Sequence, residues 1–169
     1  VTGVQTCALP IWMLFLGDVM GKAGRKAVAE RLVGLRADWG LDFVVVNGEN
    51  ATGGMGLSAE HAKALLAAGA DVVTLGDHAF DQKDIVPLLE SEPRILRPVN
   101  YSKLAPGHGA RVFEAAGGRR VLVAQVLGRV FMKQPFDDPF SAIEPVLKAG
   151  VRVTARVKVS GQTGTPMAS

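Results

Sequence analysis

The sequence predicts an α/β fold built on a mostly parallel sheet, to which a β-hairpin is added. Three short apolar runs, at residues 14–16, 43–46 and 72–75, have the length of buried strands, and the second, with three β-branched residues, is typical of a central strand buried on both faces. Segments with helical periodicity separate these runs, which is the alternation of a βαβ arrangement. We therefore expect parallel strands joined by right-handed crossovers.

The helices are expected between the strands. The first contains an apolar stripe at spacings of four, three and four, formed by Val28, Leu32, Leu35 and Trp39. Gly40 is placed to end it, and Ser58 is placed to cap a second helix over residues 59–68. A third helix, capped by Asp81, should be short or kinked because it contains Pro87.

The second half of the chain is predicted to be mixed. Residues 95–96 form a small strand, and residues 110–115 and 119–126 flank the Gly117-Gly118 turn as a hairpin. Residues 141–148 have the composition of a short helix.

Three segments of different origin are expected along the chain. Residues 1–12, VTGVQTCALPIW, look like an in-frame translation of a sequencing-library adapter, so they are expected to be a non-native leader. Met13 opens the first strand, and one domain is expected over residues 13–149. Residues 150–169 begin with the alternation of an edge strand and then become rich in Ser, Gly, Thr and Pro, so their origin is left open.

The composition is that of a soluble globular protein, with 48% hydrophobic and 21% charged residues. The net charge of +3 is mild, so charge alone does not indicate nucleic-acid binding. No apolar stretch approaches the roughly 18 residues of a membrane span. The single cysteine, Cys7, excludes an intrachain disulfide and a cysteine-based zinc cluster, so a cytoplasmic location is expected.

Each of the three apolar runs ends in a glycine that is followed by polar residues. These are Asp18 after the first run, Glu49 and Asn50 after the second, and Asp77 and His78 after the third. The carboxyl ends of parallel strands meet at one edge of a sheet, where open α/β sheets bind ligands. Three such sets predict a site for hard cations with oxygen and imidazole ligands.

Most of these residues also have an ordinary structural interpretation. Asp18 could form an Asx-turn, Asn50 could occupy a left-handed turn, and Asp77-His78 could form a loop ion pair. Glu49 is harder to explain in this way, because a carboxylate at the end of a buried strand needs a partner or a metal. Together, the groups suit two-metal phosphoester hydrolysis, in which a bridging carboxylate holds two cations.

The motifs at the strand ends resemble those of calcineurin-like metallophosphoesterases, specifically the YmdB-like family. The matching strings are GDVMG at 17–21, NGEN at 47–50, GDH at 76–78, RPVN at 97–100, PGHG at 106–109, LGR at 127–129 and DDPF at 137–140. This resemblance implies an αββα sandwich, of which the chain supplies the N-terminal portion. It also implies a metal-dependent phosphodiesterase that acts on cyclic nucleotides, with the 2′,3′-cyclic type expected.

The resemblance assigns a role to each polar residue. Asp18 would bind one metal, Glu49 would bridge, and Asn50 would give an oxygen to the first metal. Asp77 would bind the second metal, and His78 would protonate the leaving oxygen. Two divalent ions, iron or manganese, are implied as cofactors. The implied partners are a small phosphodiester or cyclic nucleotide, RNA ends, and further copies of the chain in the full-length family.

Two features depart from the family pattern. Asp77 stands where the family has Asn, and it adds negative charge to a site that must attract phosphate. The family's later histidines, in Phe-His-Ala-Glu and Gly-Thr-His-Thr-His segments, are missing, and no histidine follows Lys148. A truncated chain with incomplete metal occupancy and impaired activity is therefore expected.

Two alternative functions stay open. The chain could be a non-catalytic fragment or binding module that holds no stable metal pair. It could also be a flavodoxin-like nucleotide binder that uses the glycine-rich residues 53–56, although these lack the Lys-[Ser/Thr] of a P-loop. Metal analysis separates the first alternative from the enzyme, and nucleotide binding without metal would favour the second.

Overall fold

The computed structural model describes residues 10–132 and 134–149, so the predictions for residues 1–9 and 150–169 lie outside the described part of the chain. The elements in order are β1 (Met13–Leu16), α1 (Gly21–Trp39), β2 (Phe43–Asn47), α2 (Ala59–Ala67), β3 (Val72–Thr74), α3 (Ile85–Ser91), β4 (Ile95–Leu96), β5 (Ala110–Ala115), a 3₁₀ turn (Ala116–Gly118), β6 (Arg119–Ala124) and α4 (Pro139–Lys148). The predicted α/β class is confirmed.

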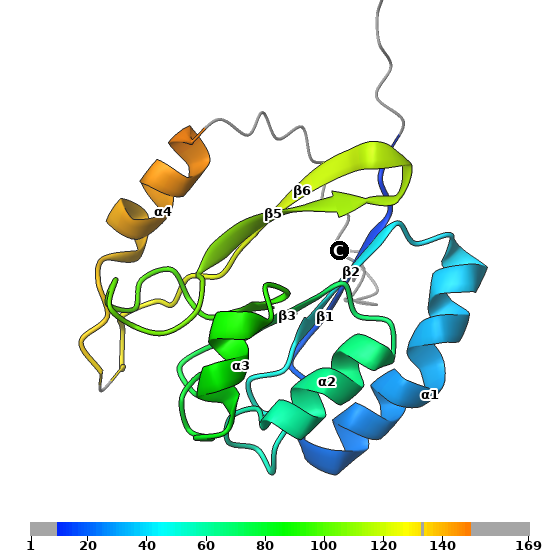
Figure 1. The fold of residues 1–169 in the computed structure, drawn as a ribbon, viewed down its shortest axis with the longest axis horizontal. Helices are drawn as coiled ribbons and strands as arrows, with labels where there is room; N and C mark the ends of the chain where they lie inside the picture. The colour runs from blue at the N-terminus through cyan, green and yellow to red at the C-terminus, as the bar shows by residue number, and fades with distance from the viewer. Residues whose placement is uncertain (1–9, 133, 150–169) are drawn as a thin grey trace, which may run out of the picture.

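The first four strands form a parallel sheet in the order β1-β2-β3-β4 (Figure 1). Leu16 pairs with Val46, and Val46 pairs with Val73, so β1, β2 and β3 end at the same edge. All five residues of β2 are buried, as predicted for a central strand. The register therefore brings the three polar segments that follow these strands to one rim.

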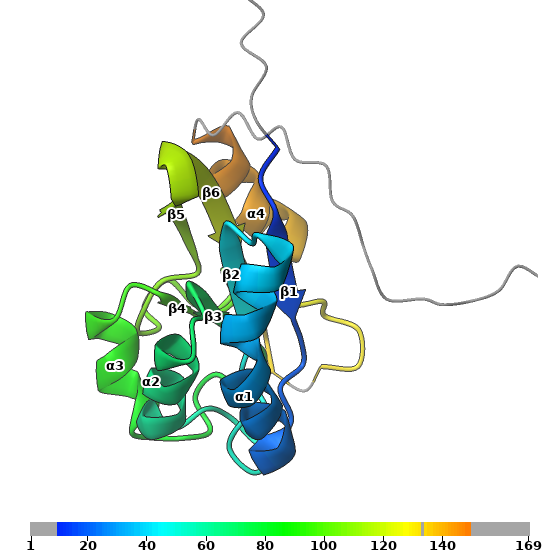
Figure 2. The ribbon, with the colours of Figure 1, turned by 90° about the vertical axis from the view of Figure 1, so that its right-hand side faces the viewer.

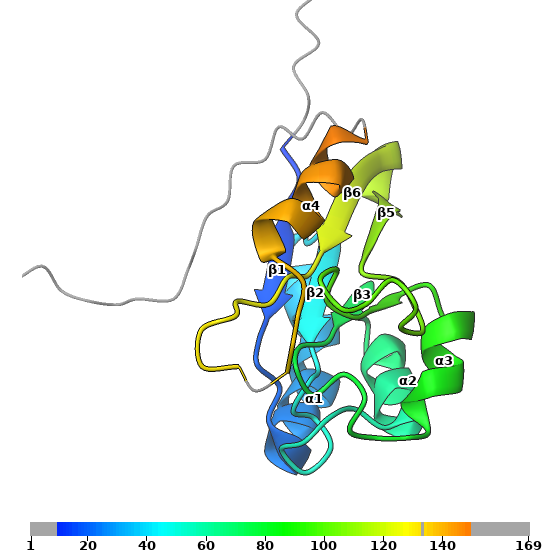
Figure 3. The same cartoon turned by 90° about the vertical axis from the view of Figure 1, so that its left-hand side faces the viewer.

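The two faces of the sheet have different covers. Val44 and Val46 belong to a core cluster that includes buried residues of α1, α2 and α3, whereas Phe43 and Val45 pack with residues of the β5-β6 hairpin. Because side chains alternate along a strand, the helices cover one face and the hairpin covers the other. Figure 2 and Figure 3 show α4 at the same end of the molecule as the hairpin, away from the three helices, and none of its residues is buried.

Several predicted helix ends are confirmed. Gly40 ends α1 in the left-handed conformation, at φ 58°, and the Ser58 hydroxyl caps α2 by accepting a hydrogen bond from the His61 amide at 3.3 Å. Trp39, the last member of the predicted apolar stripe, is 55% exposed, because the final turn of α1 extends beyond the core cluster.

The predicted start of the third helix is wrong. α3 begins at Ile85, and Asp81 does not cap it, because the Asp81 carboxylate contacts His78 instead. Asp84, which precedes α3, accepts a hydrogen bond from the Ala59 amide at 3.0 Å and so supports the start of α2. Pro87 falls in the first turn of α3, where a missing amide hydrogen costs little, so the helix is short but intact.

The start of α4 also differs from the prediction by two residues. Asp138 is its N-cap and accepts a hydrogen bond from the Ser141 amide at 2.7 Å, so the helix begins at Pro139.

Near the start of the described chain, the Trp12 amide donates to the Asp42 carboxylate at 2.8 Å. The domain boundary at residues 12 and 13 stays a prediction. Within the described ranges, no helix combines the length and apolarity that a bilayer crossing needs.

Asn100 joins the hairpin and the segment before α4 to the parallel sheet. Its side chain is fully buried, and its amide nitrogen donates to the carbonyls of Leu127 at 2.9 Å and Asp137 at 3.0 Å. Its amide oxygen accepts from the Leu127 amide at 2.9 Å. These bonds connect residues that lie 27 and 37 positions apart in sequence, so one side chain holds two distant segments in place.

We expect Asn100→Ala to lower the free energy of unfolding by about 2–3 kcal/mol, because buried backbone groups lose their partners. Urea denaturation monitored by circular dichroism measures this change. Ser102→Ala, at an exposed position two residues away, is the control and should change stability by less than about 0.5 kcal/mol. Equal, small effects of the two substitutions would show that Asn100 does not hold these segments.

Candidate active site

The loops that follow β1, β2 and β3 are fastened to one another by backbone hydrogen bonds. The Val19 amide donates to the Asn47 carbonyl at 3.0 Å, and the Gly48 amide donates to the Thr74 carbonyl at 2.9 Å. The predicted site residues Asp18, Glu49, Asn50, Asp77 and His78 therefore lie on one rim of the sheet, and none of them is fully buried.

Glu49 is the most constrained of these residues. Its Oε1 atom accepts from the Asn47 side-chain amide at 3.3 Å, while its backbone amide donates to Asn47 Oδ1 at 3.2 Å. Its Oε2 atom is buried and has no hydrogen-bond partner. Burial raises the pKa of Glu49, the Asn47 hydrogen bond opposes this, and the nearby charges of Asp77 and Asp18 raise the pKa further.

Gly76 is the residue that makes room for the Glu49 carboxylate. A Cβ atom at position 76 would overlap both Glu49 carboxylate oxygens and the carbon between them. A side chain at this position would therefore displace the carboxylate. Gly76, which directly precedes Asp77 after β3, thus leaves room for Glu49, which follows the neighbouring strand β2.

Asp18 and Asn50 form a pair on the side of the rim nearer β1. The Asn50 side-chain nitrogen donates to Asp18 Oδ2 at 2.8 Å, which orients the two side chains. The Asn50 side-chain oxygen takes no part in this bond. The pair therefore offers two kinds of oxygen donor, a carboxylate and a carboxamide, next to Glu49.

His78 is oriented by Asp81, a residue that the sequence analysis did not assign to the site. Nδ1 lies 2.6 Å from Asp81 Oδ2, and Nε2 lies 3.8 Å from Asp77 Oδ2. Because an ionised carboxylate can only accept, Nδ1 carries a hydrogen in this arrangement. The hydrogen bond to Asp81 raises the pKa of His78, burial opposes it, and the charges of Asp77, Asp81 and Glu49 add to the increase.

Tyr101 supports the Asp77-His78 segment through its backbone and was also not predicted. Its hydroxyl lies 2.9 Å from the Asp77 carbonyl and 3.3 Å from the Gly76 carbonyl. Its ring packs edge-on against the rings of Phe80 and Phe136. Burial, with the nearby acidic side chains, raises the pKa of Tyr101 to about 12, so the hydroxyl stays a neutral donor.

The donor set suits a hard divalent cation, because three carboxylates and one carboxamide supply oxygen ligands. The unpartnered Oε2 atom of Glu49 is the position where such a cation would remove an energetic penalty. Over the part of the chain that the structure describes, however, no three His, Cys, Asp or Glu side chains meet closely enough to hold a metal ion. The donor chemistry therefore fits a cation, and the coordination shell is incomplete.

The comparison with known proteins agrees with the motifs. Residues 14–160 match the family model described as YmdB-like protein. A 2′,3′-cyclic-nucleotide 2′-phosphodiesterase from Bacillus subtilis is 34% identical over 142 residues, which are 84% of this chain and 53% of that protein.

Two solved structures are similar over the same region. One is a hypothetical protein from Thermus thermophilus, with 44% identity and a TM-score of 0.76, covering 82% of this chain and 53% of that one. The other is a novel phosphatase from Mycoplasma pneumoniae, with 33% identity and a TM-score of 0.75, covering 83% of this chain and 52% of that one. The chain thus spans about half the length of the relatives it matches.

We expect Asp81→Asn to lower the pKa of His78 toward its ordinary value, measured by NMR titration in the presence of a chelator. A histidine whose pKa is raised on folding stabilises the folded chain at pH values below about 6.5, and this contribution disappears as the pH rises through the folded pKa. The difference in free energy of unfolding between wild type and Asp81→Asn should likewise decrease as the pH rises through the folded pKa of His78.

Asp84→Asn is the control, since this exposed carboxylate bonds to α2 rather than to His78. An unchanged pKa of His78 in Asp81→Asn would show that Asp81 does not orient the imidazole.

Proposed function

The chain belongs to the YmdB-like family, and we propose on that premise that its strand-end site serves metal-dependent hydrolysis of a phosphodiester. We take a 2′,3′-cyclic nucleotide as the substrate class, following the name of the Bacillus subtilis relative. The observation that carries the proposal is the buried, unpartnered Oε2 atom of Glu49, whose pKa is raised in part by both Asp18 and Asp77. An acidic cluster of this kind costs stability unless a cation neutralises it.

The proposed ligand roles are those that the family resemblance implies. We assign Glu49 to the bridging position, Asp18 and Asn50 to the first cation and Asp77 to the second; the hydrogen bond between Asn50 and Asp18 and the charge interactions of Glu49 with Asp18 and Asp77 support this assignment. In the complete family site, two iron or manganese ions would supply neutralisation of charge on the phosphate and activation of water, and in this chain incomplete occupancy of that pair is expected. Asp77 keeps an oxygen ligand at the place where the family has an amide, and its extra charge would be neutralised by the cation.

His78 is the proposed general acid. Opening a 2′,3′-cyclic phosphate expels a sugar alkoxide, which is a poor leaving group and needs a proton in the transition state. Asp81 holds Nδ1, which leaves Nε2 to carry the proton that is transferred. The raised pKa keeps the imidazole protonated to higher pH, as this role requires. Tyr101 is a positioning residue, because it holds the backbone on which Asp77 and His78 are carried.

One observation favours a second candidate function, a binding module that does not catalyse. Among the described residues the potential ligands do not close around a metal position. A chain that shows no hydrolysis of bis-nitrophenyl phosphate with added Mn²⁺ but still binds nucleotides would fit this second function.

We expect Glu49→Gln to be as stable as wild type, or more stable, in the presence of a chelator. The raised pKa means that the ionised carboxylate destabilises the folded chain at pH values above that pKa, and glutamine removes this charge. With Mn²⁺ at about 100 times Kd, wild type should gain about 2.7 kcal/mol, whereas Glu49→Gln should gain little. Thermal unfolding measures both effects.

Glu90→Gln, at an exposed position on α3, is the matched control and should keep the Mn²⁺ response of wild type. Calorimetric titration should give at most about one Mn²⁺ per chain, because the coordination shell that the described residues form is incomplete. A full Mn²⁺ response in Glu49→Gln would remove this residue from the ligand set, and two tightly held ions per chain would contradict the incomplete shell.

We expect His78→Ala to reduce hydrolysis of a 2′,3′-cyclic nucleotide by a factor of about 10²–10⁴, in a preparation that hydrolyses bis-nitrophenyl phosphate. Hydrolysis of the nitrophenyl ester should change far less, because nitrophenolate leaves as a stable anion. His108→Ala, which removes an exposed histidine outside the rim, is the control and should affect neither substrate. Equal losses on both substrates, at unchanged metal content, would make His78 a residue that positions phosphate rather than an acid.

A further inference from the structure

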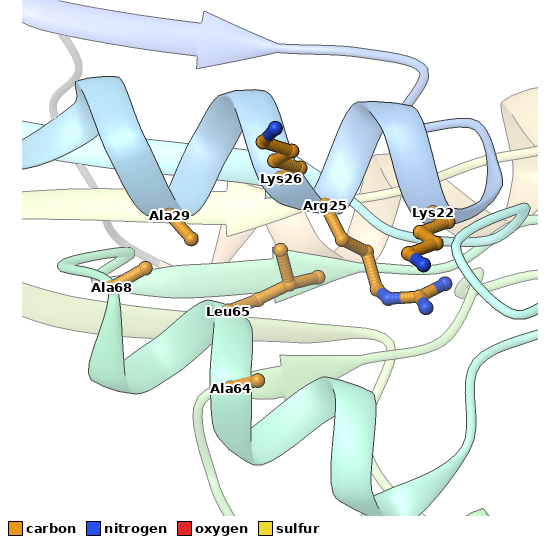
Figure 4. Close-up of a pocket in the computed structure, with 7 residues that line it drawn as sticks. All are labelled: Lys22, Arg25, Lys26, Ala29, Ala64, Leu65 and Ala68. Atoms are coloured by element: carbon orange, nitrogen blue, oxygen red, sulfur yellow. The ribbon is translucent and has the colours of Figure 1, made fainter.

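A groove between α1 and α2 has only cationic groups among its polar side chains. Lys22, Arg25 and Lys26 line it from α1, and Ala29 of α1 with Ala64, Leu65 and Ala68 of α2 form an apolar floor. Its volume is about 230 Å³, and no carboxylate lines it. Figure 4 shows Lys22 and Arg25 extending from α1 on the side that faces α2.

The position of these cations works against the stability of α1. Lys22 lies in the first turn, where the helix dipole is positive and no acidic residue is present, and Arg25 and Lys26 follow in the second turn. A cation in the first turn is unfavourable because it faces the positive end of the helix dipole, and this effect falls off beyond that turn. Lys26 has a partner in Glu30 at 3.7 Å, but both side chains are exposed, and such a pair offsets little. An anionic ligand would remove this electrostatic conflict.

The basic end of α1 is attached directly to the candidate active site. The Gly21 amide donates to the Asn50 carbonyl at 3.0 Å, and the Arg25 guanidinium donates to the Ala51 carbonyl. Asn50 and Ala51 directly follow Glu49 in the chain. The groove therefore begins beside the rim that carries the proposed ligands.

We propose that this groove binds the phosphate backbone of a single RNA strand whose 3′ end lies at the rim. The inference rests on the proposed function and narrows its substrate class. A 2′,3′-cyclic phosphate occurs both on a free mononucleotide and at the 3′ end of a cleaved RNA strand. Of these two ligands, only the RNA strand carries further phosphates. Lys22, Arg25 and Lys26, at spacings of i, i+3 and i+4, lie on one helix face that these phosphates could contact.

The lining of the groove selects backbone contact rather than base recognition. Aliphatic side chains form its floor, so it has no aromatic ring on which a base could stack and no amide that could read a base edge. A mononucleotide with a cyclic phosphate has a single negative charge, which the rim itself would engage. The net charge of +3 does not reveal this feature, because the cations matter through their local concentration.

The test is equilibrium binding of a fluorescent RNA of about 12 nucleotides that ends in a 2′,3′-cyclic phosphate. Anisotropy is measured with chelator present, so that no hydrolysis is needed. The variant Lys22→Gln/Lys26→Gln is compared with Arg31→Gln/Lys63→Gln, which removes two exposed cations from the same helices outside the groove. Thermal unfolding checks that both variants are folded.

The groove variant should bind RNA roughly 25-fold more weakly at about 0.1 M salt. Its salt slope should also be smaller by about 1.4, since each phosphate contact to a single strand contributes about 0.7. The control variant should stay within about twofold of wild type, and binding of 2′,3′-cyclic AMP, measured separately with Mn²⁺ in place of the chelator, should not change in either variant. A failure of the proposed phosphodiesterase activity would leave this binding measurement intact.

Equal losses of RNA affinity in the two variants would overturn the proposal, because they would show general charge attraction. Loss of cyclic AMP binding in the groove variant alone would also overturn it, because the groove would then hold the phosphate of the small ligand.

Discussion

The parallel register of β2 between β1 and β3 is the constraint on which the rest of the molecule depends. Every residue of β2 is buried, and its alternate side chains belong to both core clusters, so the strand cannot slip without exposing one face. Each buried valine contributes about 1.5–3 kcal/mol through burial. This packing offsets the cost of holding Glu49, a carboxylate without a partner for one of its oxygens, at the end of the same strand.

The rim shows a conflict between stability and function. A glutamine at position 49 would remove the charge, yet the chain has Glu49 there, and Gly76 leaves the room that its carboxylate needs. Local features that destabilise a fold and have no compensating structural contact are typical of functional sites. The same pattern recurs at the start of α1, where Lys22 opposes the helix dipole and Arg25 and Lys26 add positive charge beside it.

The sequence predicted the strands, the hairpin and the rim because each depends on local periodicity or on a glycine at a strand end. It did not predict Asn100, Tyr101 or Asp81 as organising residues. Asn100 and Tyr101 act through hydrogen bonds to backbone groups at least 24 residues away, and such bonds leave no trace in residue spacing. The sequence suggests Asp81 as a helix cap because an Asp before an apolar stripe is an ordinary capping signal. It does not show that Asp81, three residues after His78, hydrogen-bonds to the imidazole instead.

The two charged regions together impose an order on binding. Asp18, Glu49 and Asp77 give the rim a negative field, which repels a phosphate until a cation neutralises it. The groove on α1 has the opposite sign and needs no cation to attract a polyanion. An RNA strand held by the groove would therefore be bound but would not react until a cation binds at the rim. The side chains that would bind its backbone differ from those that would activate its terminal phosphate. Under the proposed function, the metal dependence of catalysis would follow from the negative charge at the strand ends, and affinity for an RNA strand would follow from the positive charge on α1.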